Sequence, residues 1–358
     1  MVDTDLAGRG EPPMSTSTPS RVESRVANRP ARRLRRRPAG GSLRGVAVRL
    51  VELVAVLLLV SFGTFALVSM MDADPAVTIL GEGHAPEEYA EVRAELGLDD
   101  PLVVRYVHWL GDAVTGDLGT SIVPPYHDVV DRITAALPVS VELAVLGMAM
   151  ALVLSIPLAM WSAFHAGGRV DRFVSAGTFA VLSVPSFLAG LLVILVLSNA
   201  LGWFPRAEWS RLSDGVGDNL YHVFLPALTI ALAETALFTR VLRNDLIGTL
   251  QEDFILAAKA KGMGTVHILF SDALRPSSFS MITILGISLG RLIGSTVIVE
   301  YLFALPGMGS LIISAANTGD YVTIQGAVLV VAVIYVVANA VIDIGYGYLD
   351  PRVRRSHV

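Results

Sequence analysis

The chain has 358 residues, of which 53% are hydrophobic and 16% charged, and its formal net charge is −5. Soluble globular proteins carry about 25% charged residues. The low charge content and a mean hydropathy of +0.61 therefore exclude an ordinary soluble domain and predict a membrane protein. The absence of cysteine excludes disulfides, thiolate nucleophiles and cysteine metal sites.

Residues 1–45 are rich in Pro, Ser, Thr and Arg and have few large apolar side chains, which predicts a disordered basic tail. The run Ala31–Pro38 (ARRLRRRP) also fits a twin-arginine export signal or a nucleic-acid patch. We favour a cytoplasmic tail that contacts lipid, without nucleic acid as a partner. The apolar stretch that follows is too long for a signal peptide and has no small-residue cleavage site.

Six stretches approach the roughly 20 mostly apolar residues that a helix needs to cross a bilayer. They lie at residues 46–71, 138–160, 173–200, 224–242, 277–299 and 325–348. The fourth stretch is the most polar. Pro157, Pro185 and Pro226 lie in or near these spans and are predicted kink sites, because neighbouring helices can satisfy the freed carbonyls.

The basic residues predict the orientation of the spans. Of the 27 Lys and Arg, 21 lie on one side and five on the other, and Arg291 lies within the fifth span. The five are Arg93, Arg105, Arg132, Arg206 and Arg211. By the positive-inside rule, both termini are cytoplasmic, including a C-terminal tail at residues 349–358. The predicted location is the cell membrane.

Between the first two spans, residues 72–137 form an acidic extracytoplasmic segment with thirteen Asp or Glu against three Arg. Its EEYAEVRAELGL stretch is typical of a helix. Pro101 begins a second amphipathic piece that carries Tyr106, Trp109 and Leu110. Two interpretations remain open: a docking or gating platform for an external partner, and a solvated cap.

The cytoplasmic loop at residues 243–276 contains a short predicted helix in the segment EDFILAAKAKGM. Asp253 is a candidate cap for its start, and Gly262 can end it by adopting a left-handed turn. Four residues share one face of this helix. Two of them are adjacent alanines, whose small side chains let the face enter a groove on a partner. The four residues are Phe254, Ala257, Ala258 and Lys261.

At these residues the chain resembles a known family, because Ala257-Ala258 followed by Gly262 is similar to the EAA loop of ABC importer permeases. Four more segments resemble the dipeptide and oligopeptide members, and together the matches cover roughly residues 46–355. They are Leu96–Ser121 (LGLDDPLVVRYVHWLGDAVTGDLGTS), Leu137–Ala144 (LPVSVELA), Val299–Leu311 (VEYLFALPGMGSL) and Leu349–Arg354 (LDPRVR).

The resemblance implies an all-α permease with six transmembrane helices, the first at residues 46–71 and five more in a core at residues 138–348. It implies a second homologous permease, two cytoplasmic ATPase subunits and an extracytoplasmic solute-binding protein as partners. The predicted ATPase-coupling residues are Asp253, Phe254, Ala257, Ala258, Lys259, Lys261 and Gly262. The implied cargo is a di- or oligopeptide, with glutathione or a nickel chelate as alternatives.

Two positions depart from the family pattern. The stretch FSDALRPSS (Phe270–Ser278) has Asp272 near the place where the family usually has a histidine followed by a basic or polar residue, which changes the expected contact with the ATPase. Arg291 stands where members commonly have an apolar or small residue, which changes the expected lining of the cavity.

The chain itself is predicted to be non-catalytic and to need no cofactor. Its two lysines, Lys259 and Lys261, are not in a phosphate-binding loop, so ATP must be bound by a partner subunit. The seven histidines lack metal-ligand spacing, and no metal site is expected.

Residues 286–290 match the G-x-S-x-G pattern of serine hydrolases, but they lie within a span, and spans five and six have no histidine base. We favour helix packing at Gly286, Gly290 and Gly294, whose spacing gives a thin helix face. An intramembrane hydrolase that uses Ser288 remains an alternative class.

Glu234 and Arg291 are charged residues within spans, where each costs about 2.5–3.5 kcal/mol on insertion scales. Two hypotheses follow: they line the translocation pathway, or they form a structural pair between helices. An ion-coupled secondary transporter would also use intramembrane carboxylates, and it is the other alternative class. The sequence shows no convincing internal repeat in its support.

Overall fold

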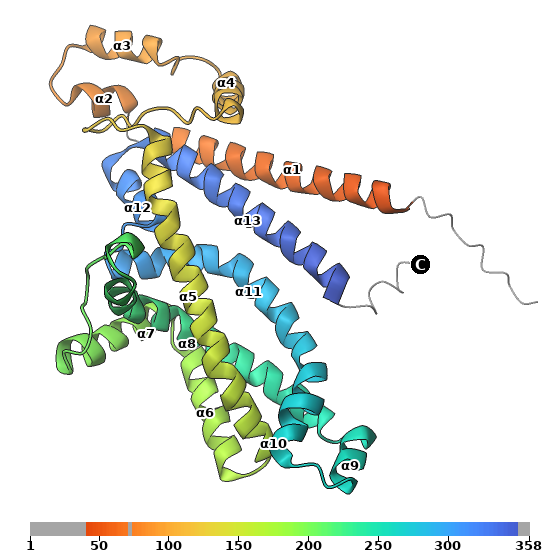
Figure 1. Ribbon diagram of the computed structural model, residues 1–358. Helices are drawn as coiled ribbons and strands as arrows, with labels where there is room; N and C mark the ends of the chain where they lie inside the picture. The colour runs from red at the N-terminus through yellow and green to blue at the C-terminus, as the bar shows by residue number, and fades with distance from the viewer. Residues whose placement is uncertain (1–40, 71–73, 350–358) are drawn as a thin grey trace, which may run out of the picture. The chain divides into compact units, whose positions relative to one another are not determined.

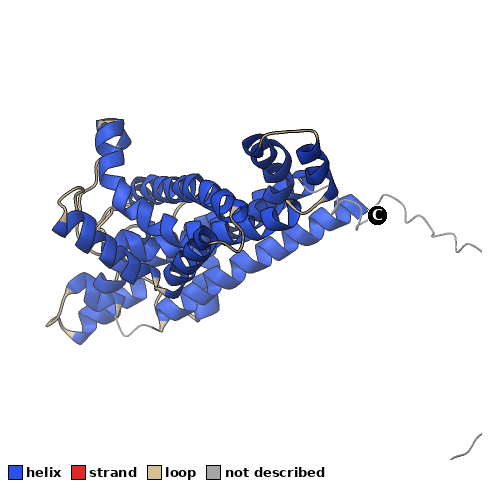
Figure 2. Cartoon of the chain, turned by 90° about the horizontal axis from the view of Figure 1, so that it is seen from below, coloured by secondary structure: helices blue, strands red, loops and turns tan. Residues whose placement is uncertain are grey.

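The computed structural model describes residues 41–70 and 74–349. The chain divides into two units, Met1–Ser42 and Leu43–Val358, and the description below concerns the second. Residues 1–40 of the predicted N-terminal tail and residues 350–358 of the predicted C-terminal tail lie outside the described residues. Within those residues the structure has helices and loops but no strand, apart from an isolated bridge between Thr120 and Asp128 (Figure 2). The predicted all-α fold is confirmed.

Figure 1 labels the main helices along the chain. They are α1 (Gly41–Ser69), α2 (Pro75–Leu80), α3 (Pro86–Glu95), α4 (Leu102–Thr115), α5 (Val129–Phe164), α6 (Arg169–Ser183), α7 (Ser186–Val193), α8 (Val216–Thr249), α9 (Asp253–Ala260), α10 (Thr265–His267), α11 (Leu274–Leu302), α12 (Met308–Thr318) and α13 (Tyr321–Leu349). Two π-helices, η1 (Ile194–Ala200) and η3 (Ile268–Ala273), and a short 3₁₀ helix, η2 (Leu212–Asp214), connect them.

By length and hydropathy, the described residues contain four helices able to cross a membrane, or six if each of two bent pairs counts as one span. The four lie in α1, α5, α8 and α13. The first bent pair is α6 with α7 and η1, and the second runs from α10 through α11. Each of the six predicted spans therefore falls on one of these helices or pairs.

Pro185 does more than kink the third span. The helix pair on either side of it is bent by 107°. Val184 has extended backbone (φ −94°, ψ 126°), as the proline ring requires of the residue before it. Pro185 then precedes α7 and has no N–H to leave unsatisfied. The predicted kink is thus a break between two helices.

Two helices begin before the spans that hydropathy predicts. The prediction of a disordered tail to residue 45 is wrong at its end, since α1 begins at Gly41. The helix α5 begins at Val129 and not at residue 138. Its start is capped by Asp128, whose carboxylate accepts a hydrogen bond of 2.8 Å from the N–H of Val130.

The polar fourth span is the central helix of the fold. In its most apolar stretch, 56% of the residues of α8 are buried, against 11% for α1. The helix packs against α5, α6, α7 and α11. Its polar residues, including Thr229, Glu234 and Thr239, therefore face protein and not lipid. This burial explains why the span needs less apolar character than the others.

The segment between α1 and α5 contains α2, α3 and α4. The helix α4 begins after Pro101, and its Tyr106 and Trp109 contact α1. The Tyr106 hydroxyl lies 2.8 Å from the hydroxyl of Ser61, and the ring of Phe65 lies 5.7 Å from that of Trp109. The helix α3 buries no residue. An aromatic contact therefore joins this segment to the first span.

Candidate functional site

The predicted coupling helix is α9, and its start differs from the prediction. Glu252, with extended backbone, is the N-cap residue and makes no side-chain capping bond. Asp253 is the first helical residue, so the predicted cap at Asp253 is wrong. A carboxylate in the first helical turn still interacts favourably with the helix dipole.

The end of α9 forms a Schellman motif. Gly262 has φ +77°, a left-handed conformation that glycine adopts without strain. The N–H of Met263 donates to the carbonyl of Ala258 at 3.2 Å, and the N–H of Gly262 donates to that of Lys259 at 3.0 Å. The left-handed turn predicted at Gly262 is confirmed, and it stops the helix after eight residues.

The two faces of α9 differ from the predicted arrangement. Ile255 is fully buried, Ala258 is 7% exposed, and both belong to the hydrophobic core of this chain. The sequence analysis placed Ala258 on the exposed face, and this prediction is wrong. The face that remains open carries Phe254, at 49% exposure, together with Ala257 and Lys261. A short helix needs an anchor on its own chain, and Ile255 with Ala258 supplies it.

The helix α9 rests on η3, which continues directly into α11. A cavity of about 410 Å³ lies beside α9, between Lys259 and Met263 on one side and residues near the ends of α5 and α8 on the other. Apolar side chains on α9 and on the segment after it are exposed. They are Phe254, Leu256, Val266 and Phe270. This end of the molecule thus presents an apolar surface next to two lysines.

Glu234 of α8 and Arg291 of α11 form an ion pair within the spans. Nη2 of Arg291 donates to Oε1 of Glu234 at 2.6 Å, and the hydroxyl of Ser288 donates to Oε2 at 2.7 Å. The side chain of Glu234 is 5% exposed, whereas that of Arg291 is 59% exposed. The carboxylate of Glu234 is therefore fixed inside the protein by two partners, and the guanidinium of Arg291 is exposed at the surface of the chain.

The environment of Ser288 argues against a serine hydrolase. Its hydroxyl donates to a carboxylate, and the residue lies inside the helix α11. The hydrolase motif needs a sharp strand-to-helix turn, and no strand occurs in residues 41–70 and 74–349. Ser288 therefore acts as a hydrogen-bond donor that holds Glu234.

The three glycines of α11 lie in different environments. Gly286 and Gly290 are buried, and a Cβ at Gly290 would lie 3.1 Å from Asn339 and 3.3 Å from Tyr335 of α13. Gly290 thus allows close packing within this chain. Gly294 is exposed, and a Cβ there would meet no described atom within 4 Å beyond its own helix and chain neighbours. Of the three, Gly294 is the one open to another subunit.

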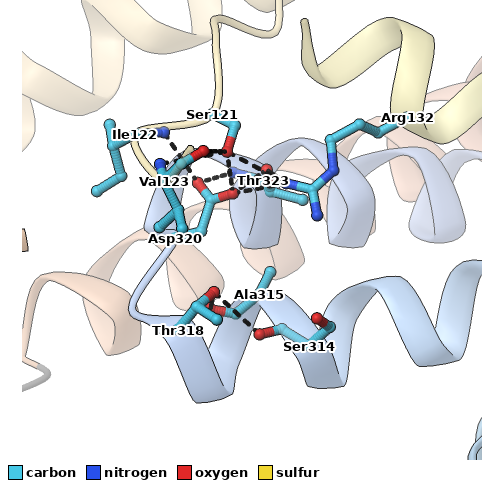
Figure 3. Close-up of polar contacts among 9 residues, drawn as sticks. All are labelled: Ser121, Ile122, Val123, Arg132, Ser314, Ala315, Thr318, Asp320 and Thr323. Atoms are coloured by element: carbon cyan, nitrogen blue, oxygen red, sulfur yellow. Dashed lines mark hydrogen bonds and ion pairs between the residues drawn. The ribbon is translucent and has the colours of Figure 1, made fainter. Parts of the chain in front are cut away.

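A polar cluster that we did not predict surrounds Asp320, the residue before α13 (Figure 3). Its Oδ2 accepts hydrogen bonds from the Ser121 hydroxyl at 2.6 Å, from Nη1 of Arg132 at 2.7 Å and from the Thr323 hydroxyl at 2.6 Å. The Asp320 side chain is 1% exposed. An aspartate directly before an apolar run is a capping signal, but it does not reveal the distant partners.

Glu300 forms a second buried contact, at the start of α12. Its Oε2 accepts hydrogen bonds from the N–H of Gly309 at 2.7 Å and of Ser310 at 3.4 Å. The hydroxyl of Ser140 accepts from the N–H of Met308 at 2.8 Å. Side chains from α11 and α5 thus satisfy the free N–H groups at this helix start. In the sequence, the signal that could have indicated this contact is a single acidic residue, Glu300, within the apolar segment VEYLFALPGMGSL.

Two stretches of the chain match models of one protein family. The model described as "Binding-protein-dependent transport system inner membrane component" matches residues 155–355, and its N-terminal counterpart matches residues 42–144. The first stretch contains α9, Glu234 and Arg291, and the second contains Ser121 and Arg132.

Individual relatives align with nearly their whole length. The chain is 32% identical over 306 residues to a probable peptide ABC transporter permease protein, y4tP, of Sinorhizobium fredii, covering 86% of this chain and 97% of the relative. It is 34% identical over 302 residues to the oligopeptide transport system permease protein AppB of Bacillus subtilis, covering 84% and 96%. Its identity to the dipeptide transport system permease protein DppB of Alkalihalophilus pseudofirmus is 28% over 326 residues, covering 86% and 98%.

Proposed function

Because the chain belongs to the family of binding-protein-dependent transport system inner membrane components, we propose that it forms half of the translocation pathway of an ATP-driven importer of di- or oligopeptides. A second homologous permease, two cytoplasmic ATPase subunits and an extracytoplasmic solute-binding protein complete the importer. The chain is a non-catalytic subunit, and its ATPase partners bind the ATP. The peptide permeases among its relatives support the class of cargo.

The observation that carries the proposal is the form of α9. This helix is anchored to its own chain by Ile255 and Ala258 and leaves Phe254, Ala257 and Lys261 open. A short helix with an aromatic side chain, a small residue and a basic residue on its open side suits a groove on a soluble subunit. In the proposed assembly, this groove belongs to the ATPase.

Force applied to α9 has a continuous route into the membrane. The helix packs on η3, and η3 continues into α11, which carries Arg291 and packs against α8 and α13. In the proposed cycle, ATP binding closes the ATPase pair and draws the coupling helices together, which opens the cavity outward. Hydrolysis resets it. The π-helical turn at η3 is a natural hinge on this route.

The distribution of basic residues supports the orientation. With 21 of 27 Lys and Arg on the side of α9, this side faces the cytoplasm together with both termini. The segment with α2, α3 and α4 then lies outside the cell membrane. In that position it serves as a platform for the solute-binding protein.

The proposed function is tested by the source of energy for uptake. The chain is reconstituted in liposomes with its partner permease, the ATPase subunits and the binding protein, and the uptake of labelled di- and oligopeptides is measured. We expect uptake to require ATP on the side of the membrane where the ATPase subunits lie. Uptake should persist when a protonophore collapses the proton gradient. Uptake that follows the proton gradient without ATP would contradict the proposal and favour an ion-coupled transporter. Glutathione and a nickel–peptide chelate, offered in the same assay, test the alternative cargoes.

A further inference from the structure

The ion pair between Glu234 and Arg291 is unequally exposed, and this asymmetry distinguishes it from a buried structural pair. A buried ion pair takes both charges out of water. Here the carboxylate is 5% exposed and held by two donors, while the guanidinium is 59% exposed. Among the residues whose side chains the structure describes, Glu234 is the one hydrogen-bond partner of Arg291.

Arg291 lies in the middle of an exposed face of α11. The residues of this face recur every three or four positions, as required for one side of a helix. They are Ile287, Arg291, Gly294, Ile298 and Tyr301. An arginine at this depth is too costly to face lipid, and intramembrane charges face protein or water-filled cavities. Arg291 therefore faces either the partner permease or the water-filled pathway between the two subunits.

We propose that Arg291 binds the carboxylate of the transported molecule, which for a peptide is its C-terminal carboxylate, as the molecule crosses the membrane. This inference rests on the proposed peptide-importer function and adds a residue that determines cargo preference. A guanidinium has five N–H donors arranged to fit a carboxylate with two parallel hydrogen bonds. One N–H of Nη2 is engaged by Glu234, which leaves the other N–H of Nη2 and one neighbouring nitrogen to bind the cargo.

Glu234 has two consequences for such a site. Its hydrogen bond from Arg291 fixes the direction in which the guanidinium points, while Ser288 fixes Glu234 itself. Its negative charge also offsets that of the arginine, so that a passing carboxylate is held weakly. Weak binding suits a transport pathway, in which the cargo must leave as readily as it enters.

The test compares peptides with their C-terminal amides, which lack the carboxylate but are otherwise the same. The complete reconstituted importer receives its binding protein saturated with labelled di-, tri- and pentaalanine or with the corresponding amides. We expect the wild-type complex to take up the free acids about tenfold faster than the amides, as expected for one charge-assisted contact. In Arg291→Gln the ratio of acid to amide uptake should approach one, whereas Arg291→Lys, which keeps the charge, should retain a clear preference.

The ratio is taken within each variant, so a lower yield of assembled complex does not change it. Equal uptake of acid and amide by the wild type, or an unchanged ratio in Arg291→Gln, would overturn the carboxylate site while leaving the peptide importer intact. If Arg291→Gln fails to assemble, the acid-to-amide ratios of the wild type and of Arg291→Lys still test the site. Ratios near one in both proteins would contradict it. Absence of any peptide uptake by the wild type would instead contradict the proposed function, and the site with it.

Discussion

Asp320 accepts a hydrogen bond of 2.6 Å from the hydroxyl of Ser121, although 199 residues separate the two in the chain. Arg132 completes the contact, with Nη1 2.7 Å from the same carboxylate oxygen. Three parts of the fold meet here: the end of the segment that follows α4, the start of α5 and the start of α13 (Figure 3). In the proposed orientation, this cluster joins the extracytoplasmic platform to the last span.

Arg132→Ala should destabilise the protein by about 3 kcal/mol, because it leaves the buried carboxylate of Asp320 without its counter-ion. The remaining hydrogen bonds from Ser121 and Thr323 keep the loss near the lower end of the usual range for such changes. The measurement is thermal unfolding of the purified protein in detergent.

Arg93→Ala is the matched control. Arg93 also pairs with an aspartate, Asp74, at 2.5 Å, but its side chain is 48% exposed. The hydrogen bond to Asp74 raises the pKa of Arg93. Exposed pairs add little stability because water screens them. Equal shifts in the unfolding temperature for both variants would contradict the structural role of the cluster at Asp320.

Gly309→Ala should destabilise the protein by about 1–3 kcal/mol, the usual cost of overpacking. A Cβ at this position would overlap the backbone of Val297 and crowd the Glu300 carboxylate that caps α12. Gly294→Ala is the control, because a Cβ there meets open space in this chain. Thermal unfolding should separate the two variants, and a loss in Gly294→Ala as large as that in Gly309→Ala would argue against this packing.

Gly294→Leu tests whether the open glycine of α11 contacts the partner permease. The substitution should leave the unfolding temperature of the isolated chain nearly unchanged, since a Cβ there has no described atom within 4 Å beyond its own helix and chain neighbours. Copurification of the second permease should decrease, because a larger residue prevents close approach of a helix. Full copurification would show that this face of α11 is not at the interface.

Ala258→Glu should detach α9 from its own chain. The new carboxylate would lie in the core beside Ile255, at a cost on the order of 3 kcal/mol, which exceeds what a helix of eight residues can offset. Hydrogen exchange should become faster for the amides of residues 253–262 while the exchange of α8 stays slow. Unchanged protection across α9 would contradict the burial of Ala258.

The residues of α9 illustrate what an eight-residue pattern can and cannot predict. The sequence correctly predicted the left-handed turn at Gly262, because glycine is favoured there by its own backbone preferences. It assigned Ala258 to the wrong face, because so short a helix allows more than one choice of buried side. Ile255, the actual anchor, becomes evident only when η3 is seen beneath it.

Long-range polar contacts could not be predicted from the sequence, for a different reason. The spans could be found because each is a local run of apolar residues, and the fold class followed from them. Arg132 and Asp320 lie 188 residues apart, and nothing local to either residue predicts their pairing. The polarity of α8 was visible, but its cause, burial among four other helical segments, depends on the tertiary structure.

The central claim, that α9 is the coupling helix for an ATPase, is tested most directly by copurification with the exposed variant Ala257→Glu. Ala94→Glu, at an exposed position of α3, is the control for adding a carboxylate to an exposed helical alanine. We predict that a mild-detergent pull-down of the tagged wild-type chain and of Ala94→Glu brings down the second permease and the ATPase subunits. Ala257→Glu should retain the second permease and lose the ATPase. Retention of the ATPase by Ala257→Glu, or its absence from the wild-type complex, would contradict the account.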